Sequence, residues 1–277
     1  MIERTFILRD GRQLTFTEIG AGPTWIHCHG IPGSRHELSH LECQLKNQAL
    51  RIIIPDRPGY GGSSESPDYS FKRHSEDLAE LAGHLRLPHF SLSGFSGGGV
   101  FALTAAAAFS TRVTEIRLAA TPAVPLMRSD CMHAAELTTN AWRSAMEDRT
   151  RLVSELTPLC EDAGALSTAL RQSSGEPDAT YLATPAVRPY FEQSTVTALS
   201  QGASTAAAAL ARDTALMVHD WGNRVTALEQ PIQLFHGTED QLVHPPHQKA
   251  LANYLPNAKI HIVPETGHYG LLTEIWR

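Results

Sequence analysis

Residues 90–99 constrain this chain most, because an apolar run there passes through a glycine-rich turn into a long alanine-rich run. The turn, Gly-Phe-Ser-Gly-Gly, has the form Gly-x-Ser-x-Gly. Between a strand and a helix, such a turn holds its serine at positive φ and exposes the hydroxyl at the end of the strand. The first N–H of the helix can then stabilise an oxyanion. We therefore predict that Ser96 is a nucleophile and Gly97 N–H an oxyanion donor. The alternative is an incidental serine, so the rest of the chain must supply a base, an acid and a second donor.

The pattern of apolar runs predicts an α/β protein. Alternating runs at 5–8 and 13–18 flank Asp10-Gly11, which indicates a hairpin. Further strands are predicted at 24–27, 51–54, 90–95, 113–119, 232–235 and 259–263, with helices at 37–48, 75–85, 97–109 and 248–255. We expect a mostly parallel, twisted sheet of about eight strands with helices on both faces.

Residues 122–229 differ from both flanks. They show no convincing strand, and helical periodicity at 132–148, 150–159, 163–170 and 203–218 is interrupted at 173–177, Pro185 and Pro189. They also carry a net charge of −5 out of the −6 of the whole chain. We predict a core formed by residues 1–121 and 230–277 and an inserted helical cap formed by 122–229.

Charge and composition exclude several classes of protein. The net charge is −6 and no basic tail is present, which argues against nucleic acid as a partner. No window approaches 18 apolar residues and the N-terminus alternates with charges, so we expect neither a membrane span nor a signal peptide. The oligomeric state is not determined by the sequence, and a homodimer is left open.

The cysteines and histidines predict neither a metal site nor a bound cofactor. Cys28, Cys43, Cys131 and Cys160 form no C-x-x-C pair, which is typical of reduced thiols in a cytoplasmic protein. The 14 histidines are scattered, and the nearest pair, His244 and His247, is separated by two prolines in an expected loop.

Two strands in the second half end in groups that can activate a serine. Asp240 follows the strand at 232–235, and His268 follows the last strand. The chain order Ser96, Asp240, His268 is the order expected with this kind of turn. His268 would accept the serine proton, and Asp240 would orient the imidazole. Glu239 is the rival acid.

The second oxyanion donor is expected in the loop His29-Gly30-Ile31-Pro32. Pro32 has no N–H, and it holds the residue before it in an extended conformation. We therefore predict that Ile31 N–H and Gly97 N–H form the oxyanion hole. His29 is expected to brace this loop rather than to react.

Taken together, the motifs at 29–34, 56–63, 94–98, 237–240 and 267–268 resemble the α/β-hydrolase superfamily, over about residues 5–120 and 229–277. The resemblance implies a cap over the nucleophile that shapes an acyl pocket, with Ile31, Phe95 and either Tyr69 or Tyr269 against the substrate. Relatives usually close with a full helix after the histidine. Only nine residues follow His268, so we expect a short last helix or none.

The function that this resemblance implies is a serine hydrolase of the carboxylesterase or lactonase type. Its substrate would be a small or medium hydrophobic ester or lactone, cleaved through an acyl-enzyme on Ser96. Epoxide hydrolases and haloalkane dehalogenases of the superfamily use an aspartyl ester, which Ser96 disfavours. A cofactor-free perhydrolase, a proline-iminopeptidase-like amidase, a C–C bond hydrolase and an acyltransferase remain alternatives. The non-enzyme alternative is a ligand-binding module on the same scaffold.

Overall fold

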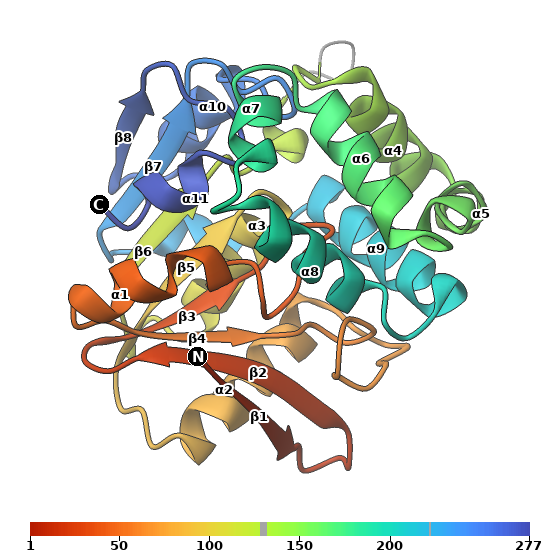
Figure 1. The fold of residues 1–277 in the computed structure, drawn as a ribbon. Coiled ribbons are helices and arrows are strands. Elements are labelled where there is room, and N and C mark those ends of the chain that lie inside the picture. The colour runs from red at the N-terminus through yellow and green to blue at the C-terminus, as the bar shows by residue number, and fades with distance from the viewer. Residues whose placement is uncertain (128–131, 222) are drawn as a thin grey trace.

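The computed structural model describes residues 1–127, 132–221 and 223–277. Within them, eight strands form one sheet in the order β1-β2-β4-β3-β5-β6-β7-β8 (Figure 1). The strands are β1 (Ile2–Ile7), β2 (Gln13–Gly20), β3 (Thr24–Cys28), β4 (Arg51–Pro55), β5 (Phe90–Phe95), β6 (Val113–Ala119), β7 (Ile232–Gly237) and β8 (Ala258–Val263). The pairs β1/β2 and β2/β4 are antiparallel and the others parallel, which confirms the predicted hairpin and the mostly parallel sheet.

Helices cover both faces of this sheet, as predicted. Ile53 of β4 lies in the cluster formed with α2 (Phe71–His84), α3 (Gly97–Ala108) and α10 (Pro246–Tyr254). Its neighbours Ile52 and Ile54 lie in a second cluster with α1 (Glu42–Asn47) and α11 (Leu271–Glu274). All three isoleucines are fully buried. The central strands read as continuous apolar runs because both of their faces are covered.

Two predicted helix boundaries in the core need correction. The helix expected at 37–48 is a short 3-10 turn, η1 (Ser39–Leu41), followed by the six-residue α1. The helix expected at 75–85 starts earlier, because Ser70 accepts a capping hydrogen bond from Arg73 N–H. The short last helix is confirmed as the four-residue α11.

Helices also fill the described part of the segment between β6 and β7, which we call the helical segment (residues 122–229). They are α4 (Glu136–Glu147), α5 (Arg149–Leu156), α6 (Ala163–Ser173), α7 (Asp178–Ala183), α8 (Arg188–Ala198) and α9 (Ala203–Val218), with 3-10 turns η2 (Val124–Leu126), η3 (Pro158–Cys160) and η4 (Asn223–Ala227). Figure 1 shows α4, α5, α6 and α9 gathered on one side of the molecule. Within the described residues, an isolated β-bridge pairs Ala134 of this segment with Val243, in the chain after β7.

The sequence did not predict α7 and α8. Pro189 was interpreted as a helix break, but it lies in the first turn of α8, where no N–H is required. The helix predicted from 132 begins only at Glu136, and the one predicted to end at 159 ends at Leu156, before Pro158.

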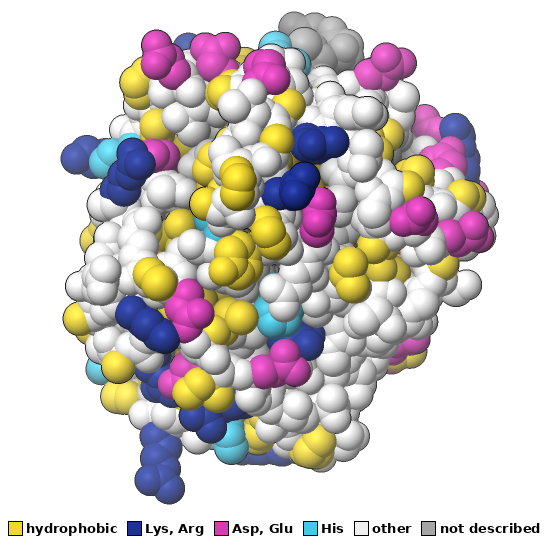
Figure 2. Space-filling view, viewed as in Figure 1, with side chains coloured by type: hydrophobic (Ala, Val, Ile, Leu, Met, Phe, Trp, Pro, Cys, Tyr) yellow, Lys and Arg dark blue, Asp and Glu magenta, His cyan; other side chains and the backbone are white. Residues whose placement is uncertain are grey.

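The surface carries charges of both signs. Figure 2 shows acidic and basic side chains interspersed over the viewed face. Among the described helices, none combines the length and the apolar character that crossing a bilayer requires.

Candidate active site

Ser96 lies between β5 and α3 at φ 51° and ψ −130°. Its N–H donates to Ala119 O at 2.8 Å, which fixes the turn against β6. The turn is too tight for side chains at its glycines, since a Cβ on Gly94 would lie 2.6 Å from Gly98 O. Such a conformation costs about 1–3 kcal/mol, so the surrounding packing holds Ser96 in it. The predicted strained turn is confirmed.

The structure brings Asp240 and His268 together. His268 Nδ1 lies 2.8 Å from Asp240 Oδ2, and both side chains are buried. Asp240 Oδ1 accepts hydrogen bonds from Leu242 N–H and Val243 N–H at 3.0 and 2.9 Å, which fixes the carboxylate. The rival acid Glu239 is exposed and accepts from Thr238 Oγ1 instead.

Electrostatics favour an ionised Asp240 beside the imidazole. Burial alone would lower the pKa of His268, but the Asp240 carboxylate, with smaller contributions from Asp178 and Glu37, raises it above its ordinary value. Burial would raise the pKa of Asp240, whereas His268 and the hydrogen bonds hold it below its ordinary value. The carboxylate fixes the tautomer in which Nδ1–H donates, so Nε2 is the nitrogen that can accept a proton.

The loop after β3 is held by a network around Gly30. Gly30 N–H donates to Glu37 Oε1 at 2.8 Å, and Gly30 O accepts from Arg57 Nη2 at 2.9 Å and from His29 Nδ1 at 3.0 Å. His29 therefore braces the loop, as predicted. In a trans peptide the C=O and the next N–H point in opposite directions. The contacts to Gly30 O thus turn Ile31 N–H away from Arg57.

Ile31 N–H and Gly97 N–H are free backbone donors beside Ser96. In residues 1–127, 132–221 and 223–277, neither group has a hydrogen-bond acceptor. The two residues adjoin, since a Cβ on Gly97 would lie 2.6 Å from Ile31 Cδ1. Both line the same cavity as Ser96.

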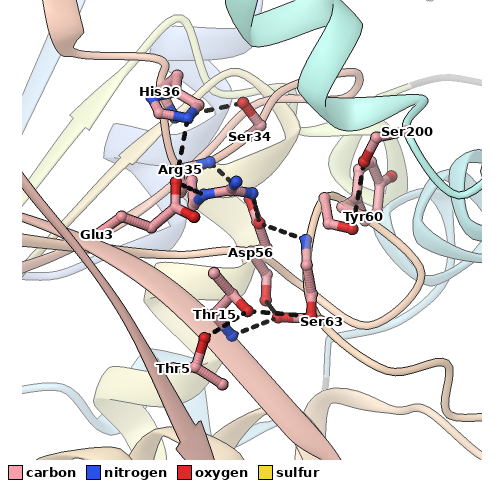
Figure 3. Close-up of polar contacts among 12 residues, drawn as sticks. Glu3, Thr5, Thr15, Ser34, Arg35, His36, Asp56, Tyr60, Ser63 and Ser200 are labelled. Atoms are coloured by element: carbon pink, nitrogen blue, oxygen red, sulfur yellow. Dashed lines mark hydrogen bonds and ion pairs between the residues drawn. The ribbon is translucent and has the colours of Figure 1, made fainter.

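A buried carboxylate, Asp56, organises the loop that carries Arg57 (Figure 3). It accepts from Arg35 N–H at 2.7 Å, from the Arg35 guanidinium at 2.5 Å and from Gly62 N–H at 3.1 Å. Arg35 also binds Glu3 of β1 at 2.8 Å. Burial raises the pKa of Asp56 to about 6, although Arg35 and the N–H donors oppose this.

The helical segment is tied to these loops by buried polar contacts. Asp213 of α9 accepts from Arg57 Nε at 2.6 Å, and both side chains are buried. Gln201 Nε2 donates to Ser63 O at 2.6 Å, and Ser194 Oγ of α8 lies 3.1 Å from Ser34 Oγ. The loop that carries Ile31 is therefore packed between the sheet and the helical segment.

A cavity of about 160 Å³ lies between the sheet edge and the helical segment. At one end it is lined by Ile31, Phe95, Ser96, Gly97, His268 and Tyr269. Its other walls are mainly apolar side chains of α4, α5, α6 and α9, among them Trp142, Leu156, Leu166, Leu170, Leu210 and Met217. Among the described residues, no Lys, Arg, Asp or Glu lines it. This cavity suits an apolar group bound next to Ser96.

Tyr69, His244 and His247 are not among the residues that line this cavity. Tyr69, offered as an alternative to Tyr269, is buried against Phe101, and its hydroxyl lies 2.7 Å from His74 Nδ1. His244 and His247 do not form a metal pair, because His247 is engaged by Ala123 N–H and Met132 O. More broadly, within the described ranges no three His, Cys, Asp or Glu side chains come together as metal ligands would. Cys28, Cys43 and Cys160 are free thiols, and Cys131 lies outside the described residues.

Sequence reasoning missed three groups that the structure places around the site. Glu37 and the pair Arg57–Asp213 hold the Ile31 loop, and Asp178 contacts the loop of His268. Arg57 stands in the motif at 56–63, which could have marked it. Asp178 and Asp213 lie in the helical segment, where no motif distinguishes them from the other acidic residues.

Comparison with known proteins adds a family and a set of relatives. The alpha/beta hydrolase fold family matches residues 23–275. The chain is similar to an epoxide hydrolase of Caballeronia sordidicola, with 33% identity over 103 residues that cover 36% of this chain and 31% of that protein. It is also similar to the bifunctional epoxide hydrolase 2 of Sus scrofa, with 30% identity over 122 residues, 43% of this chain and 22% of that protein. The matches thus span a third or less of the length of these relatives.

Similar solved structures cover almost the whole chain. A thermophilic esterase from Thermogutta terrifontis has a TM-score of 0.75 at 24% identity, covering 99% of this chain and 94% of that one. An esterase from Exiguobacterium antarcticum has a TM-score of 0.73 at 19% identity, covering 98% and 94%. At this level of identity, the likeness shows the fold.

Proposed function

This chain belongs to the α/β hydrolase fold family, and from that premise we propose that it is a serine hydrolase acting on small or medium hydrophobic carboxylic esters or lactones. One observation carries the proposal. Ser96, His268 and the free N–H groups of Ile31 and Gly97 line one apolar cavity, with Asp240 bound to the far nitrogen of the imidazole.

This arrangement supports a two-step acyl transfer. Ser96 Oγ attacks the ester carbonyl while His268 Nε2 accepts its proton, and the ionised Asp240 stabilises the imidazolium. The N–H groups of Ile31 and Gly97 donate to the oxyanion of the tetrahedral intermediate. The imidazolium then protonates the leaving alcohol. Water, activated by the same imidazole, releases the acid from Ser96.

The helical segment would act as the cap that selects the acyl group. Its helices supply most of the apolar wall of the cavity, including Trp142 and Met217. Each methylene buried there favours binding by about 0.8 kcal/mol, whereas a charged acyl chain would meet no Lys, Arg, Asp or Glu among the described lining residues.

Two alternatives are weakened by specific residues. Opening an epoxide through an aspartyl ester requires a carboxylate where this chain has Ser96, although two of its relatives are named epoxide hydrolases. A proline-iminopeptidase-like amidase would need an acidic group to bind the amine of its substrate, and residues 122–229 carry a net charge of −5. No described acidic side chain of that segment lines the cavity, so a substrate amine would have no counter-charge there.

An activity panel tests the proposal. Purified protein is assayed on p-nitrophenyl esters from acetate to dodecanoate, on lactones, on an aryl epoxide and on an aminoacyl amide, with Ser96→Ala as the blank. We expect hydrolysis of uncharged esters or lactones, and a loss of about 10³-fold or more in kcat for Ser96→Ala. Epoxide hydrolysis without ester hydrolysis, or full activity of Ser96→Ala, would contradict the proposal.

A further inference from the structure

Asp178, the first residue of α7, reaches from the helical segment to the loop that carries His268. Its Oδ2 accepts from His268 N–H at 2.5 Å, and its Oδ1 accepts from Tyr269 N–H at 2.8 Å and Gly270 N–H at 3.2 Å. The side chain is buried, with 1% of its surface exposed. One carboxylate thus binds three consecutive backbone donors of this loop.

The loop is shaped to receive this carboxylate. A Cβ on Gly267 would lie 2.4 Å from Asp178 Oδ2, so glycine at this position permits the close approach. Burial raises the pKa of Asp178 to about 6, although His268 and the N–H donors oppose it, so the group is charged at neutral pH. A buried carboxylate is tolerated only when its oxygens accept hydrogen bonds, and the loop supplies them.

Among the described residues, the other hydrogen bonds of this loop leave the N–H groups of His268, Tyr269 and Gly270 to Asp178. The helix after it, α11, has four residues. Thr266 O accepts from Glu239 N–H at 3.0 Å, on the side of the loop before His268. From His268 to Gly270, Asp178 is the side chain that takes up the backbone donors.

Building on the proposed serine hydrolase, we propose that Asp178 is a positioning residue, whose carboxylate clamps the His268 loop and so holds the imidazole between Asp240 and Ser96. The helical segment would thereby help to position the catalytic base, in addition to shaping the pocket. Asp178 acts through His268 and does not line the cavity.

The charge of Asp178 gives the proposal a measurable consequence. Three carboxylates face His268: Asp240 at Nδ1, Asp178 at the backbone and Glu37 from the loop after β3. The rings of Phe95 and Tyr269 lie at centroid distances of 4.8 and 5.4 Å, and the imidazole of His236, 3.5 Å from Asp240 Oδ2, also interacts electrostatically with His268. Each negative charge stabilises the imidazolium and raises the pKa of His268.

The test compares Asp178→Asn with the matched control Glu176→Gln, which removes a charge from an exposed side chain two residues earlier. Active sites are counted with a fluorophosphonate, and kcat, KM and the pH profile are measured on the best ester of the panel. For Asp178→Asn we expect kcat to fall about 10- to 100-fold with KM within about twofold of wild type, because the base is misplaced and the pocket is intact. The acid limb of the pH profile should move to lower pH. Glu176→Gln should match wild type in kcat and in the position of the acid limb.

A kcat per labelled site and an acid limb equal to wild type in Asp178→Asn would overturn the proposal, even if that variant melts at a lower temperature. If Asp178→Asn does not fold, Gly267→Ala provides a second test, because its Cβ displaces the carboxylate and keeps the charge. An unchanged kcat in Gly267→Ala would also overturn the proposal.

A measurement without substrate separates this proposal from the proposed function. The His268 imidazole is titrated by NMR in protein labelled with ¹³C-histidine, with its signal assigned from His268→Gln. A lower pKa of His268 in Asp178→Asn than in wild type supports the clamp, and equal values overturn it. Failure of the wild type to react with any ester or fluorophosphonate would instead overturn the proposed function.

Discussion

Two neighbouring carboxylates in the loop after β7, Asp240 and Glu239, lie in different environments. Asp240 is buried, accepts two backbone N–H groups and binds His268, whereas Glu239 is exposed. Only the first can hold an imidazole tautomer, because an exposed carboxylate has no fixed geometry towards the ring.

We therefore expect Asp240→Asn to lower kcat by about 10⁴-fold, the size of the effect in the serine-protease triad. The amide would favour the wrong tautomer of His268 and give no charge to the imidazolium. Glu239→Gln should change kcat by less than about twofold, and steady-state kinetics on the best ester compares the two variants. A larger loss in Glu239→Gln would mean that the acid is assigned to the wrong residue.

Residues in local motifs were predictable from the sequence. Ser96, Asp240 and His268 each follow a strand, and the structure brings them to the same edge of the sheet. Asp178 was not predictable, because its donors lie about 90 residues away and its neighbours carry no motif. The choice between Tyr69 and Tyr269 likewise depended on tertiary packing.

At the scale of elements, buried strands were predicted more reliably than short helices. The apolar runs of the sheet were sufficient to place all its strands within a few residues. In the helical segment, α7 and α8 have six and eleven residues and weak periodicity, so their existence depends on contacts with the core. Pro189 illustrates why helix boundaries are hard to predict from the sequence, since a proline can end one helix or begin the next.

One histidine joins α10 to the start of the helical segment. His247 Nδ1 accepts from Ala123 N–H at 2.9 Å, and Nε2 donates to Met132 O at 2.7 Å. A backbone N–H can only donate and a C=O can only accept, so the imidazole must be neutral. Burial lowers the pKa of His247 to about 4, with the bond to Met132 opposing.

This arrangement predicts that the contact between α10 and the helical segment becomes less stable in acid. In the unfolded chain His247 binds a proton as the pH falls below 6.5, whereas in the folded protein it stays neutral down to about pH 4. The free energy of unfolding therefore falls as the pH falls through this window. Gln in place of His247 can accept from Ala123 and donate to Met132 without titrating. Between pH 7 and 5, urea unfolding should show wild type losing about 2 kcal/mol more than His247→Gln.

The other buried histidines, such as His40 and His74, titrate equally in both proteins, so their contribution cancels in this comparison. Parallel stability curves for wild type and His247→Gln would contradict the prediction.

At the scale of the whole molecule, we propose that chemistry and selectivity come from different parts of the chain. The sheet and its loops supply Ser96, Asp240 and His268, and the helical segment supplies most of the apolar wall. Arg57–Asp213 and the Asp178 contacts fasten the two parts together at the Ile31 loop and the His268 loop. Because one fold hosts many reactions, we expect substrate choice to depend on this apolar wall.

The central claim is that Ser96 is an activated nucleophile, and covalent labelling tests it most directly. Folded wild-type protein is treated with a fluorophosphonate at neutral pH, and the modified peptide is identified by mass spectrometry. We predict one adduct, on Ser96, and none in Ser96→Ala. Folded wild-type protein that stays unlabelled, or an adduct on another residue that persists in Ser96→Ala, would contradict the claim.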